Sequence, residues 1–345
     1  MIMEKRITIK DIAEECSVSI TTVSRILNNK KGYCTPETEE KVLKAVEKAH
    51  YYPNPAARSL VTKKTNLIGV ILPDIYNYFF QDFFKGAEDF LRTQGYNLVL
   101  CNTDGDAGKE KEFLNSFSQG IVDGIIISTS NREDDNTPIL KLARSKFPIV
   151  TVERYGEELK EIPRILVGNR EAECMVVHNL YEKGHRRIAF ICGPEKADNA
   201  KRRFEGYCQG LEEVGIPFDK KLICRGDYKL DSGYKAVKRL LDSAKDFTAI
   251  IASNDLMAVG ACKAIRDAGK SVPDDISVIG YDGTALADLL QPTLSTMVLH
   301  GYNMGKASAE NLLKIIRGKE VTDKKVVFTP ELKAGESVRA IGQEV

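Results

Sequence analysis

The chain has 345 residues, of which 43% are hydrophobic and 29% are charged, and its net charge is +1. These values are ordinary for a soluble globular protein of two or three domains, and they exclude a strong overall electrostatic field as a guide to a partner. No apolar run approaches the length of a membrane-spanning helix, and the GxGxxG, GxxxxGK(S/T), GxSxG and HExxH motifs of common enzyme classes are absent.

The charge is unevenly distributed along the chain. Residues 1–64 carry 12 Lys and Arg against 8 Asp and Glu, a net charge of +4, whereas the remainder carries −3. A basic head on an acidic body indicates an anionic partner for the head.

The cysteines and the N-terminal segment bear on the cellular compartment. The eight cysteines are scattered and none forms a CxxC pair, so we expect reduced thiols, no metal site and no cofactor. The first residues lack the apolar stretch of a signal peptide. We therefore expect a cytoplasmic protein that does not associate with a membrane.

Three short helices are predicted in the first fifty residues. Residues 8–16 repeat apolar side chains at helical spacing after a capping-box-like start. Ser17 interrupts this pattern, and Ser19 can cap a second helix over residues 19–28. A third helix starts at Thr35-Pro36, and its apolar face closes the core. Two short helices joined by a tight turn, with a third beside them, predict a helix-turn-helix unit.

The second helix has a polar outer face, and in a helix-turn-helix unit this helix lies in the major groove of DNA. Arg25 can reach guanine acceptors or a phosphate, Ile20 can pack on a thymine methyl group, and the hydroxyls can contact bases or phosphates. The alternative is a generic three-helix scaffold whose polar face meets only water. The predicted DNA-contacting residues of this unit are Thr8, Ser19, Ile20, Thr21, Thr22, Ser24, Arg25 and Asn28.

A linker rich in Pro, Ala and basic residues follows over residues 54–64. The apolar Leu60 has no core within obvious reach, so its burial requires a partner. A plain solvated linker is the alternative interpretation. We predict that Asn54, Ala57 and Leu60 contact DNA.

The run ITIKDIAEECSVSITTVSRILN, followed by TPETEEKVLKAVEKAHYYPNPAARSL, resembles the headpiece of the LacI/GalR family of bacterial transcription regulators. The resemblance implies that the TVSR helix reads the major groove and that residues 57–60 fold into a helix on operator DNA. It also implies that Leu60 wedges between the central base pairs of a pseudo-palindrome from the minor groove.

Some headpiece residues depart from the family pattern. Ser17 occupies a turn position where many members have Gly, and Glu39 stands where a basic residue is common. Ile20 and Thr21 occupy the main specificity positions, so the operator sequence does not carry over from any one member.

From residue 67 onward, strand-like and helical runs alternate in two successive series. The first series has strands at 67–73, 97–103, 124–129 and 148–154, and the second starts near residue 166. The segment LSTMVL, a long helix over 302–317 and the segment VVFTP come last. Such alternation predicts an α/β fold in which parallel sheets are covered by helices, in two lobes.

The predicted strand ends carry aromatic and planar polar side chains. Ligands of open α/β sheets bind beyond the carboxyl ends of strands. Aromatic rings can pack on the apolar faces of a sugar, and Asp, Asn and Arg groups can hydrogen-bond its hydroxyls. Taken singly, each residue has a structural alternative as a core, capping or solvated side chain. Together they predict a sugar site formed by Phe79, Phe80, Glu153, Arg154, Arg203, Tyr228, Asn254 and Asp282.

The body is similar to the type I periplasmic sugar-binding fold, and its motifs are similar to those of ribose-type members. Residues that carry over from that pattern are Phe79, Phe80, Arg154, Arg203, Tyr228, Asn254 and Asp282. Glu153 stands where ribose binders have Asp, and Leu299 stands where many sugar binders have Gln. We therefore expect a pentose or similar monosaccharide. The LacI/GalR family also contains members that answer to purines or to a partner protein, and both remain alternatives.

The predicted domains are a helix-turn-helix headpiece over residues 1–53, a hinge over 54–64 and an effector-binding and dimerisation domain over 65–345. In the family fold the chain crosses between the lobes more than once. The first lobe would hold about 65–166 and 299–325, and the second about 167–298 and 326–341.

The resulting functional hypothesis is a sugar-responsive repressor that binds pseudo-palindromic operator DNA as a homodimer and has no enzymatic activity. A solute-binding protein without DNA binding is the first alternative, and an α/β enzyme is the second. The headpiece disfavours the former, and the absence of a recognisable catalytic motif disfavours the latter.

Overall fold

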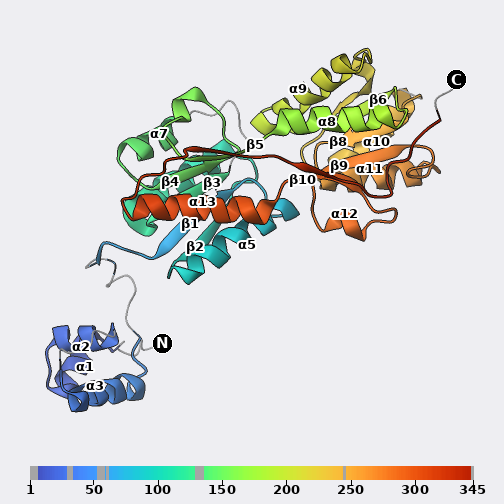
Figure 1. Ribbon diagram of the computed structural model, residues 1–345. Coiled ribbons are helices and arrows are strands. Elements are labelled where there is room, and N and C mark those ends of the chain that lie inside the picture. The colour runs from blue at the N-terminus through green and yellow to red at the C-terminus, as the bar shows by residue number, and fades with distance from the viewer. Residues whose placement is uncertain are drawn as a thin grey trace. The chain divides into compact units, whose positions relative to one another are not determined.

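The computed structural model describes residues 7–28, 34–52, 59, 62–128, 136–243 and 246–342. The chain divides into two units, Met1–Thr65 and Asn66–Val345, each with its own elements (Figure 1). In the described part of the chain, no helix combines the length and the apolar character that crossing a membrane requires.

Three helices described in the first unit surround a small apolar core. These are α1 (Ile9–Cys16), α2 (Ile20–Leu27) and α3 (Pro36–Lys48). Each helix starts at a hydroxyl side chain that accepts a backbone N–H of the first turn, from Thr8, Ser19 and Thr35 respectively. Such caps satisfy donors that a short helix leaves unpaired. The fully buried core residues are Ile12, Val23 and Val42.

The turn between α1 and α2 places a non-glycine residue in the left-handed region. Ser17 has φ 56° and ψ 42°, and its N–H returns to the last turn of α1. Glycine is the residue that adopts this conformation at little cost, because it lacks a Cβ. This left-handed conformation gives a structural reason why Gly is common at this position in the family that the headpiece resembles.

The first lobe of the second unit is built on a six-stranded parallel sheet in the order β11-β5-β4-β3-β1-β2. Its strands are β1 (Leu67–Leu72), β2 (Asn97–Asn102), β3 (Gly124–Ser128), β4 (Ile149–Val152), β5 (Arg164–Val167) and β11 (Lys325–Phe328). Its helices are α5 (Tyr78–Thr93), α6 (Ala107–Ser116), α7 (Thr137–Arg144) and α13 (Gly301–Ile316), and a π-helical turn spans Phe117–Ile121.

Helices α5 and α13 approach each other closely, although they are far apart in sequence. A Cβ at Gly86 would lie 1.9 Å from the Tyr302 carbonyl oxygen, and one at Gly305 would lie 1.8 Å from the Phe83 carbonyl oxygen. Only glycine allows this backbone approach, which covers one face of the sheet.

The second lobe is built on a six-stranded sheet in the order β12-β10-β9-β8-β6-β7, in which only β12 is antiparallel to its neighbour. Its strands are β6 (Ile188–Cys192), β7 (Ile223–Arg225), β8 (Ala249–Ala252), β9 (Ser277–Asp282), β10 (Ser295–Val298) and β12 (Glu331–Lys333). Its helices are α8 (Asn169–Glu182), α9 (Asp198–Glu213), α10 (Leu230–Ser243), α11 (Asp255–Asp267) and α12 (Leu286–Leu289), and a 3₁₀ turn spans Lys220–Leu222. A further 3₁₀ turn, Glu157–Leu159, lies between β4 and β5 of the first lobe.

The chain passes between the lobes after β5, after β10 and after β11 (Figure 1). One predicted boundary was wrong. Residues from 326 onward were assigned to the second lobe, but β11 pairs with β5 and so belongs to the first sheet up to Phe328. β11 adds a parallel strand at the edge of the first sheet, and the chain passes to the second lobe only after Phe328. The short strand β12 was not predicted.

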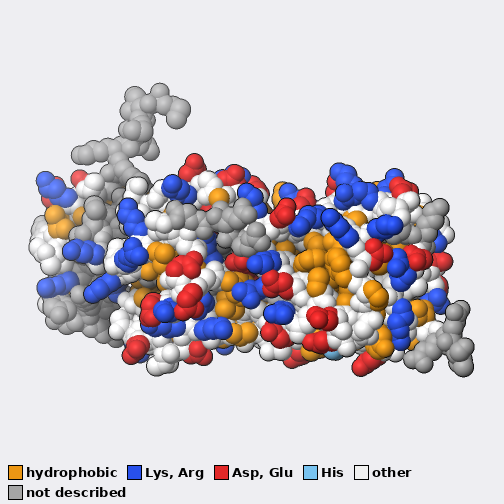
Figure 2. Space-filling view, turned by 90° about the horizontal axis from the view of Figure 1, so that it is seen from above, with side chains coloured by type: hydrophobic (Ala, Val, Ile, Leu, Met, Phe, Trp, Pro, Cys, Tyr) orange, Lys and Arg blue, Asp and Glu red, His pale blue; other side chains and the backbone are white. Residues whose placement is uncertain are grey.

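The two-lobed α/β prediction is confirmed by these two sheets and their helices. Figure 2 shows that Lys and Arg side chains are interspersed with Asp and Glu on the visible face, with apolar patches between them, the broadest in the right half of the view. On that face no single sign of charge dominates, in agreement with the net charge of +1.

Ser17 provides a test of the turn geometry. We expect Ser17→Gly to raise the free energy of unfolding of the first unit by up to about 1 kcal/mol, because glycine adopts positive φ without steric cost. Ser17→Val should lower it by about 1–2 kcal/mol, because a β-branched residue is strained at positive φ. Hydrogen exchange of the α1 and α2 amides in the full chain measures both effects. A shift of both variants in the same direction would contradict this account.

Candidate functional site

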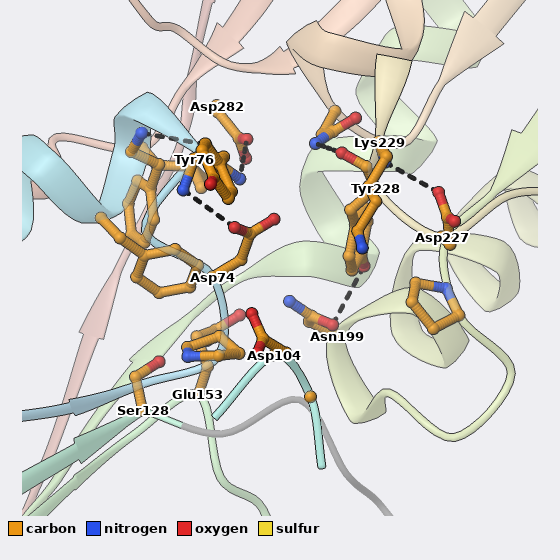
Figure 3. A pocket seen from close by; sticks show the side chains of 18 of the residues that line it. Asp74, Tyr76, Asp104, Ser128, Glu153, Asn199, Asp227, Tyr228, Lys229 and Asp282 are labelled. Carbon is orange, nitrogen blue, oxygen red and sulfur yellow. Dashed lines mark hydrogen bonds between the residues drawn. The ribbon is translucent and has the colours of Figure 1, made fainter. Parts of the chain in front are cut away.

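A cavity of about 310 Å³ lies between the two lobes of the second unit. Small-molecule sites span about 300–1,000 Å³, so this volume suits a small ligand. In Figure 3, Asp74 and Tyr76 lie across the cavity from Tyr228 and Lys229. The lining residues follow strand ends of both sheets, and they are Pro73, Asp74, Tyr76, Asn77, Phe79, Phe80, Asp104, Gly105, Ser128, Glu153, Pro194, Asn199, Arg203, Asp227, Tyr228, Lys229, Asn254, Asp282 and Leu299.

Arg203 of α9 is the central cation of the cavity and is only 2% exposed. Its Nε donates to Asn169 Oδ1 at 2.9 Å, and its Nη1 donates to the backbone carbonyl of Ser253. The guanidinium also stacks on the Tyr281 ring, 3.6 Å from the ring centre. Among the described residues, its Nη2 has no hydrogen-bond partner, so this group can donate to a ligand. The alternative that Arg203 is a solvated helix residue is wrong.

Asp282 ends β9 beside Arg203. Its Oδ1 lies 3.8 Å from Arg203 Nη1, and its Oδ2 accepts a hydrogen bond from Asn77 Nδ2 at 3.1 Å. Burial raises the pKa of Asp282 to about 7, although the Arg203 charge opposes this shift. Asn77 caps α5 in the first lobe, whereas Asp282 belongs to the second. The hydrogen bond between them therefore joins the lobes at the cavity.

Glu153 follows β4 and supports the cavity wall through neighbouring groups. Its Oε1 accepts the Tyr155 hydroxyl at 2.9 Å and the Val167 N–H at 2.7 Å, and its Oε2 accepts Asn169 Nδ2 at 2.7 Å. Burial raises the pKa of Glu153, and these donors oppose the shift. Because Asn169 in turn accepts from Arg203, Glu153 also orients the guanidinium.

Aromatic side chains line the cavity from both lobes. Phe79 and Phe80 meet edge to face with ring centres 5.1 Å apart and an interplanar angle of 73°. Tyr228 comes from the second lobe, and its hydroxyl donates to Asn199 Oδ1 at 3.0 Å. Apolar faces from both lobes, with polar groups between them, form a cavity suited to a ring with polar substituents.

Asn254 has the structural role of a helix cap. Its Oδ1 caps α11 by accepting the Met257 N–H, and its Nδ2 donates to the Tyr228 carbonyl, both at 2.9 Å. It also lines the cavity. Asn254 therefore both caps α11 and forms part of the cavity wall.

Arg154 is the one predicted site residue of the second unit that does not line the cavity. It is 2% exposed, and its Nη1 and Nε donate to Glu110 Oε1 and Asn136 Oδ1, each at 2.6 Å. Glu153 lines the cavity, whereas the next residue, Arg154, points into a buried ion pair with Glu110.

Sequence reasoning missed several lining residues, namely Asp74, Tyr76, Asn77, Asp104, Ser128, Asn199, Asp227 and Lys229. Most follow a predicted strand by one to a few residues, so strand ends were the available signal. Five carboxylates and two cations line the cavity: Asp74, Asp104, Glu153, Asp227 and Asp282 against Arg203 and Lys229. The cavity is thus predominantly acidic.

In the first unit, α2 exposes the predicted DNA-contacting face. Ile20 is 47% exposed, and Thr21, Arg25 and Asn28 are exposed as well. Thr22 and Ser24 are partly buried.

Thr8 and Ser19 are exposed, but their hydroxyls are engaged in caps, with Asp11 and with Thr22 respectively. The predicted contacts Asn54, Ala57 and Leu60 lie outside the described residues.

Comparisons with known proteins cover nearly the whole chain. Residues 8–54 match the family model of bacterial regulatory proteins of the lacI family, and residues 177–338 match a periplasmic binding protein-like domain. The ribose operon repressor of Halalkalibacterium halodurans is 37% identical over 312 residues, 90% of this chain and 91% of its own. Catabolite control protein A of Priestia megaterium is 37% identical over 325 residues, 94% and 96% of the two chains.

A solved structure shows the same architecture. The lac repressor dimer bound to operator and an anti-inducer has a TM-score of 0.85, with 25% sequence identity over 97% of this chain and 100% of that chain.

Proposed function

The chain belongs to the LacI family of bacterial regulatory proteins, which regulate transcription and are not enzymes, and we propose that a small neutral sugar of the pentose class controls its affinity for operator DNA. The predicted resemblance to this family is confirmed by the matches over both units. One relative at 37% identity is a ribose operon repressor, which supports a sugar effector.

The observation that carries the proposal is the donor–acceptor pair at the centre of the cavity. Arg203 Nη2 is left to donate, and Asp282 Oδ1 lies 3.8 Å from the same guanidinium. Neighbouring hydroxyls of a sugar can donate to the carboxylate and accept from the guanidinium at the same time. The rings of Phe79, Phe80 and Tyr228 provide apolar surface for the carbon–hydrogen faces of the sugar.

The charge of the lining favours a neutral ligand. Five carboxylates line the cavity, against Arg203 and Lys229. A phosphate group would be repelled by these carboxylates in a partly desolvated site, where charge interactions are stronger than in water. We therefore infer an unphosphorylated sugar. A purine base is the second candidate, because the aromatic walls would also suit its planar ring.

Ligand binding to substituted proteins tests the site. We expect a pentose to stabilise the protein in a thermal-shift screen, and phosphopentoses, hexoses and purines to stabilise it less. In isothermal titration, Arg203→Lys and Asp282→Asn should each cost about 1–3 kcal/mol of binding free energy, because a buried partner loses its hydrogen bond. The matched control is Arg202→Lys, since Arg202 neighbours Arg203 in sequence but does not line the cavity. Unchanged affinity in both site variants would place the effector elsewhere.

The affinity should depend on pH through Asp282. Its pKa is raised to about 7, so the acceptor form is present above that pH and is lost as the pH falls through it. If the sugar needs the ionised form, the affinity decreases by up to about tenfold per pH unit below pH 7. Arg203, Asp255 and Glu153 face the same group and affect the midpoint. The Asp282→Asn variant should bind the sugar weakly at every pH. A wild-type affinity that stays constant over about two pH units on either side of pH 7 would refute this role of Asp282.

Arg25 is the residue of α2 proposed to read a base. Arg25→Ala should weaken binding to a specific pseudo-palindromic duplex by about 1–3 kcal/mol if the guanidinium makes a bidentate base contact. The matched control is Lys44→Ala, because Lys44 is an exposed residue of α3 paired with Glu40 at 2.7 Å. Competition gel shifts at constant salt compare specific and non-specific DNA. Equal losses for the two variants would assign Arg25 only a general electrostatic contribution.

A further inference from the structure

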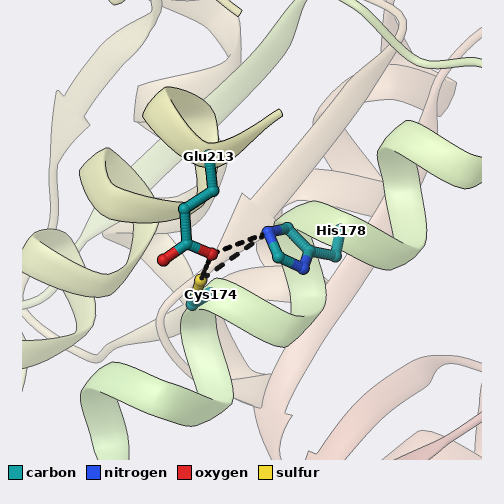
Figure 4. Close-up of side chains that lie close together, drawn as sticks. All are labelled: Cys174, His178 and Glu213. Atoms are coloured by element: carbon teal, nitrogen blue, oxygen red, sulfur yellow. Dashed lines mark hydrogen bonds and ion pairs between the residues drawn. The ribbon is translucent and has the colours of Figure 1, made fainter. Parts of the chain in front are cut away.

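Three metal-binding side chains meet on the surface of the second lobe, away from the cavity (Figure 4). Cys174 and His178 lie one turn apart on α8, and Glu213 is the last residue of α9. Residues four apart on a helix share a face. The thiol, the imidazole and the carboxylate therefore point toward one another across the contact between the two helices.

The donor atoms have separations close to those of one coordination shell. Glu213 Oε2 lies 3.2 Å from Cys174 Sγ and 3.0 Å from His178 Nε2, and Sγ and Nε2 are 3.9 Å apart. Tetrahedral zinc, with metal–ligand distances of about 2.0–2.3 Å, places its donor atoms about 3.3–3.8 Å apart. Shifts of a few tenths of an ångström, within the freedom of these side chains, would give that geometry.

The surroundings orient the donors and leave them accessible. Gln209 Nε2 donates to Glu213 Oε1 at 2.6 Å, which directs Oε2 toward the thiol and the imidazole. Gln209 is itself held by Arg170 Nε at 2.7 Å. The Cys174 side chain is buried, whereas His178 and Glu213 are each 42% exposed, so an ion can enter from solvent. Such outer hydrogen bonds are typical of metal sites.

We propose that Cys174, His178 and Glu213 form a binding site for a divalent cation of the zinc class, with water in the fourth position. A thiolate and an imidazole together favour zinc and cobalt over magnesium and calcium, which prefer oxygen ligands. On binding, sulfur forms a bond to the metal and the thiol proton passes to the buffer. The positive charge of Arg170 opposes the cation, and the negative charge of Glu171 in the same surface hollow supports it.

The sequence predicted no metal site because its donors form no recognisable motif. Glu213 is 35 residues beyond His178 and becomes a neighbour only when α9 packs on α8. A bound ion would fasten these two helices together. Their other ends carry Asn169 and Arg203 of the cavity, but the metal site does not depend on the proposed sugar.

Titration of the metal-free full-length protein with Co²⁺ and Zn²⁺ tests the site. We expect one Co²⁺ per chain, a sulfur-to-cobalt charge-transfer band, displacement of cobalt by Zn²⁺, and release of about one proton in calorimetry. Cys174→Ser should abolish the charge-transfer band, and Glu213→Gln should weaken binding at least about tenfold. The matched controls are Cys262→Ser, a thiol of α11, and Glu171→Gln, a carboxylate of the same hollow, and both should retain the band.

The alternative is a hydrogen-bonded cluster that only joins the helices. Absence of stoichiometric Co²⁺ binding to the wild-type protein, or a charge-transfer band that persists in Cys174→Ser, would overturn the proposal. Circular dichroism of each variant verifies its folding. His178→Gln provides a second variant on the exposed side of the cluster, and retention of wild-type cobalt affinity by this variant would also overturn the proposal.

Discussion

The buried guanidinium of Arg203 is the constraint on which the cavity depends. A charge taken out of water is costly unless partners surround it. Arg203 receives Asn169, the Ser253 carbonyl, Asp282 and the face of Tyr281 as partners. These groups come from α8, from the end of β8 and from β9, so one cation fixes the relative positions of several strand ends. The Nη2 group of Arg203 and the carboxylate of Asp282 are therefore already positioned before a ligand binds.

The same charge links the two lobes. Asp282 faces Arg203 with one oxygen and accepts from Asn77 with the other, while Asn77 Oδ1 accepts the Phe79 N–H at the start of α5. A ligand that competes for Asp282 acts on this hydrogen bond between the lobes and on the helix that presents Phe79. A regulator requires such a contact, because an effector changes a distant affinity only if it interacts differently with two arrangements of the protein.

Local sequence patterns were sufficient for most of the fold, whereas the site needed tertiary information. The strands from β1 to β10 are apolar runs that periodicity identifies, but β12 has the alternating exposure of an edge strand and too little apolar sequence for detection. Arg203 and Asp282 were found because they lie at strand or helix ends. Arg154 was placed at the cavity because the resemblance extends to its position, and only its ion pair with Glu110, 44 residues earlier, shows that it points away. The cluster of Cys174 and Glu213 depends in the same way on helix packing.

The acidic groups around Arg203 determine how the cavity responds to solution conditions. Burial raises the pKa of Asp282 to about 7, of Asp255 to about 6 and of Glu173 to about 8. Asp255 is stabilised as a carboxylate by Thr284 and Thr296, whereas both oxygens of Glu173 are buried without a hydrogen-bond partner. Burial therefore favours the protonated form of Glu173, and the carboxylates that stabilise the charge of Arg203 are Asp282 and Glu153. Since Asp282 is both the partner of Arg203 and the acceptor proposed for the sugar, hydroxyl binding and proton release are coupled at this one carboxylate.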